Sequence, residues 1–194
     1  MLPDASDATP ADTRLQLLAL LRSGAAAPDP VRVRALIESL ECSHPADLDR
    51  DRALLAGVWE LRWSSSALPY LAVAPWLENL QLLDPERGRG MNLLRLAGPL
   101  GSVAGIAVQA ELTLVPAERG ERAQRVGVRF QRGGWLGPRL GDQRLQLLRE
   151  VNQSFPAWLD ITVLDADLRV CRGNAGTLFA LIRRTDLRLS DWFA

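Results

Sequence analysis

The spacing of apolar residues changes along the chain, from a helical period in the first third to strict alternation in the rest. Leucines between positions 15 and 21 recur at helical spacing, and Asp12 or Thr13 is expected to cap this first helix. Asp29 and Pro30 form a favoured cap and first-turn pair for a second helix. The second helix carries one apolar face, made of Val33, Leu36, Ile37 and Leu40.

The alternating part of the chain predicts β-strands. The run from Trp59 to Ser64 alternates without exception, and similar runs follow with turn residues such as Gly133-Gly134 between them. About eight antiparallel strands predict a closed barrel or a sandwich, and we expect the barrel because eight strands can close around one small ligand. Residues 142–151 fit a short helix or a strand, and both alternatives stay open. The other expected strands are 80–83, 92–96, 106–115, 125–130, 161–164, 168–171 and 178–182.

Length and composition fit one mainly β (α+β) protein with a helical extension. The chain has 194 residues, of which 47% are hydrophobic and 24% charged, as in ordinary globular proteins. We expect residues 1–53 to form an N-terminal helical segment that packs on a barrel formed by residues 54–194. No stretch approaches the roughly 18 to 20 apolar residues of a membrane span, and no signal peptide is recognised, so a cytoplasmic location with peripheral membrane contact is expected.

The charged and reactive residues exclude several classes of function. Acidic and basic residues balance at 23 each, which argues against a nucleic-acid partner. Every basic residue except the single His44 is an arginine, which excludes Schiff-base chemistry on lysine and a phosphate-loop lysine. His44, Cys42 and Cys171 show no zinc-ligand spacing, so we expect two free thiols, no metal and no cofactor.

One acidic cluster, Asp160, Asp165 and Asp167, has the residue types for acid–base chemistry. The structural interpretation is favoured, because aspartates at positions 165 and 167 suit a hairpin turn. In that interpretation Asp160 pairs with an arginine such as Arg169 or Arg172. No catalytic residue is therefore predicted.

Two features of the chain resemble known families. Trp59 in the first strand and Arg183-Arg184 after the last resemble the lipocalin-like arrangement, in which a tryptophan plugs one barrel end and a late arginine packs over it. The run from residue 160 to 181 is similar to the signature of the plastid lipid-associated protein, or fibrillin, family. Gln81, Asp84 and Asn92 also fall where that family has Gln, Asp and Asn. The matching motif residues, which we interpret as mainly structural, are Gly57, Trp59, Asp160, Asp165, Leu168, Arg169, Arg172, Gly173, Gly176 and Phe179.

The family resemblance covers roughly residues 30 to 184 and implies a lipocalin-like antiparallel barrel. It implies non-catalytic binding or sequestration of a small hydrophobic molecule, such as a lipid, quinone or carotenoid, at or near photosynthetic membranes. The short chain predicts a cyanobacterial member. Trp63, Val163 and His44 depart from the family pattern and bear on what a cavity accepts. The candidate cavity residues are Trp59, Leu61, Trp63, Ile106, Val108, Val128, Phe130 and Phe179, and plain core packing is an equal alternative for each.

Two other functions remain as alternatives. The first is a structural protein that coats lipid globules or thylakoid surfaces with an apolar rim from residues 70–77, Trp135, Trp192 and Phe193. The second is a barrel isomerase or cyclase with Asp160 or Asp165 as the base, which requires one of these carboxylates to face an apolar cavity.

Overall fold

The computed structural model describes residues 9–23, 28–66, 68, 71, 73–98, 101, 105–141 and 143–193. Within these ranges three α-helices precede a nine-stranded antiparallel sheet. The helices are α1 (Pro10–Arg22), α2 (Pro30–Ser43) and α3 (Leu48–Leu55), and a short 3₁₀ helix, η3 (Leu189–Asp191), follows the strands. The strands are β1 (Gly57–Ser64), β2 (Leu77–Asp84), β3 (Arg89–Leu96), β4 (Gly105–Leu114), β5 (Arg125–Leu140), β6 (Gln143–Glu150), β7 (Ala157–Leu164), β8 (Leu168–Gly173) and β9 (Leu178–Arg183).

The helix ends follow capping rules. Asp29 caps α2 as predicted, and its side chain accepts from the Val31 N–H. The predicted cap of α1 was wrong by three residues or more: Thr9 caps the helix, and its side chain and that of Asp12 form a capping box around Pro10. The helix α3 was not predicted, because a helix of only eight residues with four charges shows little periodicity.

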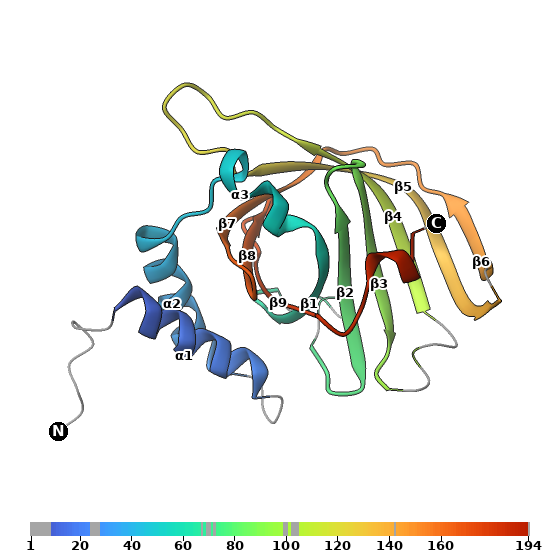
Figure 1. Cartoon of the computed structure of the whole chain (residues 1–194), viewed down its shortest axis with the longest axis horizontal. Coiled ribbons are helices and arrows are strands. Elements are labelled where there is room, and N and C mark those ends of the chain that lie inside the picture. The colour runs from blue at the N-terminus through green and yellow to red at the C-terminus, as the bar shows by residue number, and fades with distance from the viewer. Residues whose placement is uncertain are drawn as a thin grey trace.

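The predicted barrel is confirmed. The hydrogen-bonded order is β4-β3-β2-β1-β9-β8-β7-β5-β6, and an additional β4–β5 pairing closes a ring of eight strands. Residues 143–150, left open between helix and strand, form β6, which pairs only with the second half of β5. Figure 1 shows the ring, with α1 and α2 on one side of it and β6 at the opposite side.

The turn predicted at Gly133-Gly134 was wrong, because β5 continues through both glycines to Leu140. The glycine at 134 allows β6 to approach: a Cβ there would lie 2.2 Å from the carbonyl oxygen of Leu147. The strand therefore runs for 16 residues and serves both the ring and its extension.

Bulges decide which side chains face the interior. In β1 the register against β9 shifts between Leu61 and Trp63, so Arg62 is the extra residue. Trp59 and Leu61 belong to the interior cluster, but Trp63 packs with the helices on the outer face. Strict alternation predicts that Trp59, Leu61 and Trp63 all face the interior. The bulge at Arg62 instead places Trp63 on the outer face.

Three apolar clusters fill the molecule. The interior cluster lies inside the ring and includes Trp59, Leu61, Ile161, Cys171 and Leu181. A second cluster joins α1 and α2 to the outer face of β7, β8, β9 and β1. A third lies on the outer face of β2, β3 and β4, where the C-terminal segment crosses the strands (Figure 1).

The interior is plugged at the end where β1 begins. Trp59 is fully buried there, and its indole N–H donates to the Leu55 carbonyl at the end of α3. The Arg183 guanidinium lies 4.2 Å from the centroid of the Trp59 ring and donates to the carbonyl oxygens of Leu54, Ala56 and Ala166. This end is closed by an aromatic ring, a guanidinium and a short helix.

We expect Trp59→Ala to lower the free energy of unfolding by about 3–5 kcal/mol, because it leaves a large cavity beneath Arg183. Urea denaturation followed by far-UV circular dichroism measures the change. Trp76→Ala is the matched control, since Trp76 is 64% exposed, and its effect is expected within about 0.5 kcal/mol. Equal losses in the two variants would contradict the assignment of Trp59 as the plug.

Candidate ligand-binding interior

The inward-facing side chains become more exposed from the plugged end of the ring to the other end. Trp59 and Leu61 are buried in the interior cluster, and Phe179 is partly buried. Farther along, Val108 is partly buried, and Ile106 is 61% exposed. The ring is therefore filled near Trp59 and open at the end where β4 starts.

Four apolar residues form a continuous row at the open end. The strand registers pair Leu94 with Ile106, Ile106 with Trp135 and Trp135 with Leu147, so these side chains stand side by side on one face. That face is the inner one, because the adjacent Leu93, Ala107 and Leu136 belong to the cluster on the outer face. Trp135 is 40% exposed and Leu147 64%. We call Leu94, Ile106, Trp135 and Leu147 the inner row.

The C-terminal aromatic residues do not belong to a rim at this opening. Trp192 lies between two guanidinium groups, 5.1 Å from Arg95 and 4.3 Å from Arg144, and packs on the outer cluster. Phe193 packs on the same cluster beneath Arg89, at 4.9 Å. The predicted apolar rim therefore loses both residues, and Tyr70, which it also included, lies outside the described residues.

The wall of the ring has a seam where β7 and β6 share one edge of β5. β7 pairs with residues 125–128 and β6 with residues 132–140. Between them the side chain of Gln153 replaces a strand: its Oε1 accepts from the Phe130 N–H at 2.6 Å, and its Nε2 donates to the Val128 carbonyl at 3.2 Å. A groove of about 940 Å³ follows this seam and is lined in part by Val128, Phe130 and Phe155.

The structure thus separates the eight candidate cavity residues into four places. Trp59 and Leu61 fill the closed part of the interior, whereas Phe179, Ile106 and Val108 lie farther from the plug. Val128 and Phe130 line the seam, and Trp63 lies outside. Of the inner row, only Ile106 is among the cavity residues predicted from the sequence. The alternation of apolar residues around Leu147 indicates a strand that could carry part of the row. It was not used because residues 142–151 also fit a short helix.

One charged side chain lies inside the ring. Arg169 of β8 is fully buried, its Nη2 donates to Gln81 Oε1 of β2, and its guanidinium lies 5.3 Å from the Trp59 ring. Burial lowers the pKa of Arg169 to about 10, and the neighbouring Cys171 thiol acts in the opposite direction. Arg169 therefore carries its charge at neutral pH.

The acidic candidates lie outside, in ion pairs. Asp160 accepts from Arg125 Nε at 2.7 Å, so its partner is neither Arg169 nor Arg172 as predicted. The register places Asp160 opposite both Arg125 of β5 and Arg172 of β8, but Arg172 donates to Glu41 of α2 instead. Asp165 accepts from Arg14 Nε at 2.6 Å and from the N–H groups of Asp167 and Leu168. Neither carboxylate faces an apolar cavity, and the isomerase or cyclase alternative loses the base on which it depended.

The remaining motif residues shape the β7–β8–β9 hairpins and attach the helices. Arg172 donates from Nε to Glu41 Oε1 of α2 at 2.9 Å, and Leu168 packs in the cluster shared with α1 and α2. Gly176 has a φ of 76° in the β8–β9 turn, a conformation that favours glycine. Gly173 packs against the Phe179 ring, and Gly57 against Arg183.

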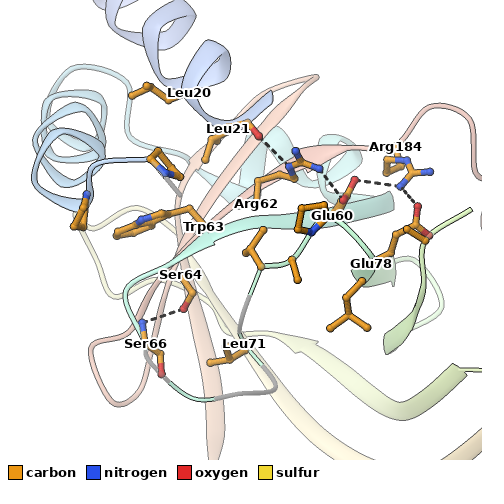
Figure 2. A pocket seen from close by; sticks show the side chains of 17 residues that line it. Leu20, Leu21, Glu60, Arg62, Trp63, Ser64, Ser66, Leu71, Glu78 and Arg184 are labelled. Carbon is orange, nitrogen blue, oxygen red and sulfur yellow. Dashed lines mark hydrogen bonds and ion pairs between the residues drawn. The ribbon is translucent and has the colours of Figure 1, made fainter. Parts of the chain in front are cut away.

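A second hollow, of about 710 Å³, lies outside the ring between the helices and β1 (Figure 2). Trp63, Leu21 and Leu71 contribute its apolar lining. Its charged residues pair with one another: Glu60 accepts from Arg62 at 2.9 Å and from Arg184 at 3.1 Å. Arg184 also donates to Glu78, and Arg62 to the Leu21 carbonyl (Figure 2). These contacts hold α1 and β2 against β1.

The described residues contain no group of three or more His, Cys, Asp or Glu side chains able to hold a metal ion. Cys42 and Cys171 are both free thiols, the first exposed and the second buried. None of the helices described has the length and apolar character required to cross a membrane.

The Arg14–Asp165 ion pair predicts that the stability of the fold depends on pH. Burial disfavours the ionised Asp165, but the hydrogen bonds from Arg14 and from the two N–H groups outweigh it, and the pKa of Asp165 is lowered. The contact therefore stabilises the fold above the unfolded-state pKa of about 3.9 and is lost as the pH falls through the lower folded value.

Asp165→Asn is accordingly expected to reduce the free energy of unfolding by about 1–2 kcal/mol at pH 7. The difference from wild type should shrink below about pH 4, where the Asp165 carboxyl of the unfolded chain begins to bind its proton while that of the folded chain is still ionised. Urea denaturation at a series of pH values measures it. A difference that stays constant from pH 7 to pH 3 would show that the ion pair does not contribute.

Comparison with known proteins gives one match. The family model described as PAP_fibrillin matches residues 21–182, which include the end of α1, α2, α3, β1 to β8 and all but the last residue of β9. Searches of curated proteins and of solved structures return no match.

Proposed function

Because the chain belongs to the PAP/fibrillin family, we propose that it binds a small hydrophobic molecule, such as a lipid, quinone or carotenoid, on the open inner wall of its barrel. The observation that carries this proposal is the inner row, in which apolar neighbours from three strands remain exposed, and one from a fourth partly exposed, on the concave side of the sheet. The membership itself indicates a lipid-associated structural or binding role.

The two faces of the same strands argue for a ligand on the inner side. On the outer face, Leu93, Ala107 and Leu136 are buried beneath the C-terminal segment. On the inner face, Ile106, Trp135 and Leu147 are between 40% and 64% exposed. Each Å² of apolar surface removed from water contributes about 25 cal/mol, so a hydrophobic molecule against this wall would be held by burial alone. This is a binding role without catalysis, at or near photosynthetic membranes.

The test replaces one residue of the inner row without disturbing the core. Ile106→Gln is expected to weaken binding of β-carotene or ubiquinone by about tenfold or more, because an aliphatic contact is lost and a polar group must be desolvated. Quenching of tryptophan fluorescence measures the affinity, since Trp135 adjoins the site. Leu15→Gln, at a position in α1 with the same 60% exposure, is the control and should bind as wild type. A wild-type protein without saturable binding of any such ligand would refute the proposal.

A second function, the coating of a lipid surface, is supported by a different group of exposed residues. Leu68, Val73 and Trp76 in the β1–β2 connection and Leu96 at the end of β3 are exposed apolar residues. Leu96 pairs with Leu77, and the Ala97 N–H donates to the Trp76 carbonyl, so these two stretches are neighbours. An apolar edge of this kind is suited to contact with a membrane or lipid globule.

In a flotation assay with galactolipid vesicles, the wild-type chain is expected to float, and Trp76→Ser to reduce the floating fraction severalfold. Leu15→Ser is the control, because Leu15 is 60% exposed in the first half of α1, outside the β1–β2 connection and the end of β3. A chain that remains in the bottom fraction with every lipid tested would exclude the coating function and leave the ligand-binding proposal untouched.

A further inference from the structure

We propose that the molecule bound inside the barrel carries a carboxylate head group, and that Arg169 is the residue that binds it. This inference rests on the proposed function and adds the chemical class of the ligand. It starts from Arg169, described above for its burial and its contact with Gln81 inside the ring.

The direction of the Arg169 side chain follows from its contacts. It starts on β8 and meets Gln81 on β2, and these strands are separated in the sheet by β9 and β1. The contact therefore crosses the inside of the ring. Its Nε and Nη1 atoms are buried without an oxygen acceptor among the described residues, and the neighbouring side chain that interacts with the guanidinium is the Cys171 thiol, a weak acceptor.

Several arginines on the outside of the barrel, unlike Arg169, have carboxylate partners. Each of several outer guanidinium groups lies within 3.1 Å of a carboxylate oxygen: Arg14, Arg62, Arg125, Arg172 and Arg184. Inside, Gln81 is neutral, and burial raises the pKa of the Cys171 thiol, so that the thiol is uncharged as well. Arg183, which lies on the Trp59 ring, adds a second positive charge to the same end.

This arrangement is electrostatically incomplete in the free protein. A buried cation without a counter-ion is destabilising, and buried donors without strong acceptors add to that cost. A carboxylate offers both the opposite charge and acceptor oxygens, whereas a carotene offers neither. An acidic amphiphile is therefore the ligand class that the interior fits best.

Polar side chains on the inner wall lead from Arg169 toward the open end. Gln81 is partly exposed, and it pairs in register with Asn92, which is exposed and in turn pairs with Val108. The inner row lies two residues farther along the strands, which is about 7 Å. A head group at Arg169 would thus place its hydrocarbon tail against Ile106 and its neighbours.

The test compares two ligands that differ only in the head group. We expect oleate to bind wild-type protein between about ten- and a hundredfold more tightly than oleyl alcohol at pH 8, as a charge-assisted hydrogen bond to a buried guanidinium implies. Arg169→Met should reduce this ratio to near one without weakening the binding of the alcohol. Arg172→Met, on the same strand but facing outward to Glu41, is the matched control and should keep the ratio.

A measurement on wild-type protein covers the case in which Arg169→Met does not fold. The carboxyl resonance of ¹³C-labelled oleate should titrate at a lower pH in the complex than in free solution. Equal binding of acid and alcohol, or a ratio preserved in Arg169→Met, would overturn this inference and leave the proposed function standing. Absence of binding by oleate, oleyl alcohol, quinone and carotenoid alike would overturn both.

Discussion

The pairing of β4 with β5 is the contact on which the architecture depends, because it turns a sheet into a ring. It gives each strand an inner and an outer face, and the three apolar clusters follow from that division. The other edge of β5 is shared between β7 and β6, so the strand that closes the ring also carries the seam in its wall. The closed ring and the seam therefore both depend on the length of β5.

Much of this fold could be predicted from the order of apolar and polar residues, and the failures have identifiable causes. The helical period and the capping residues predict α2, and the alternation of apolar and polar residues predicts the strands and the barrel. Alternation could not reveal the bulge at Arg62, because a bulge is a property of two paired strands, and it moved Trp63 to the outer face. Gly133-Gly134 was taken for a turn, although close approach of β6 explains the second glycine equally well. The inner row was largely missed since it depends on registers between four strands.

The charges are arranged so that the helices and the barrel are bound together from the outside. Arg14 joins α1 to the β7–β8 turn, and Glu41 of α2 accepts from Arg172 of β8. Such pairs are partly exposed, and they contribute less to stability than the apolar cluster beneath them, but they set the position of the helices. In a chain whose cations are nearly all arginines, this leaves Arg169 as the exception, since its environment is apolar and its pairing incomplete.

The terminal position of β6 has a consequence for contacts between molecules. A closed ring has no free strand edge, but the hydrogen-bonded order here ends at β6, whose outer edge has no partner strand in the part of the chain described. Backbone groups on such an edge can accept a strand from another chain, and the exposed Arg149 and Glu150 are the kind of charged residues that discourage unspecific pairing. The hairpin that extends the inner wall is thus also the place where the sheet could be lengthened.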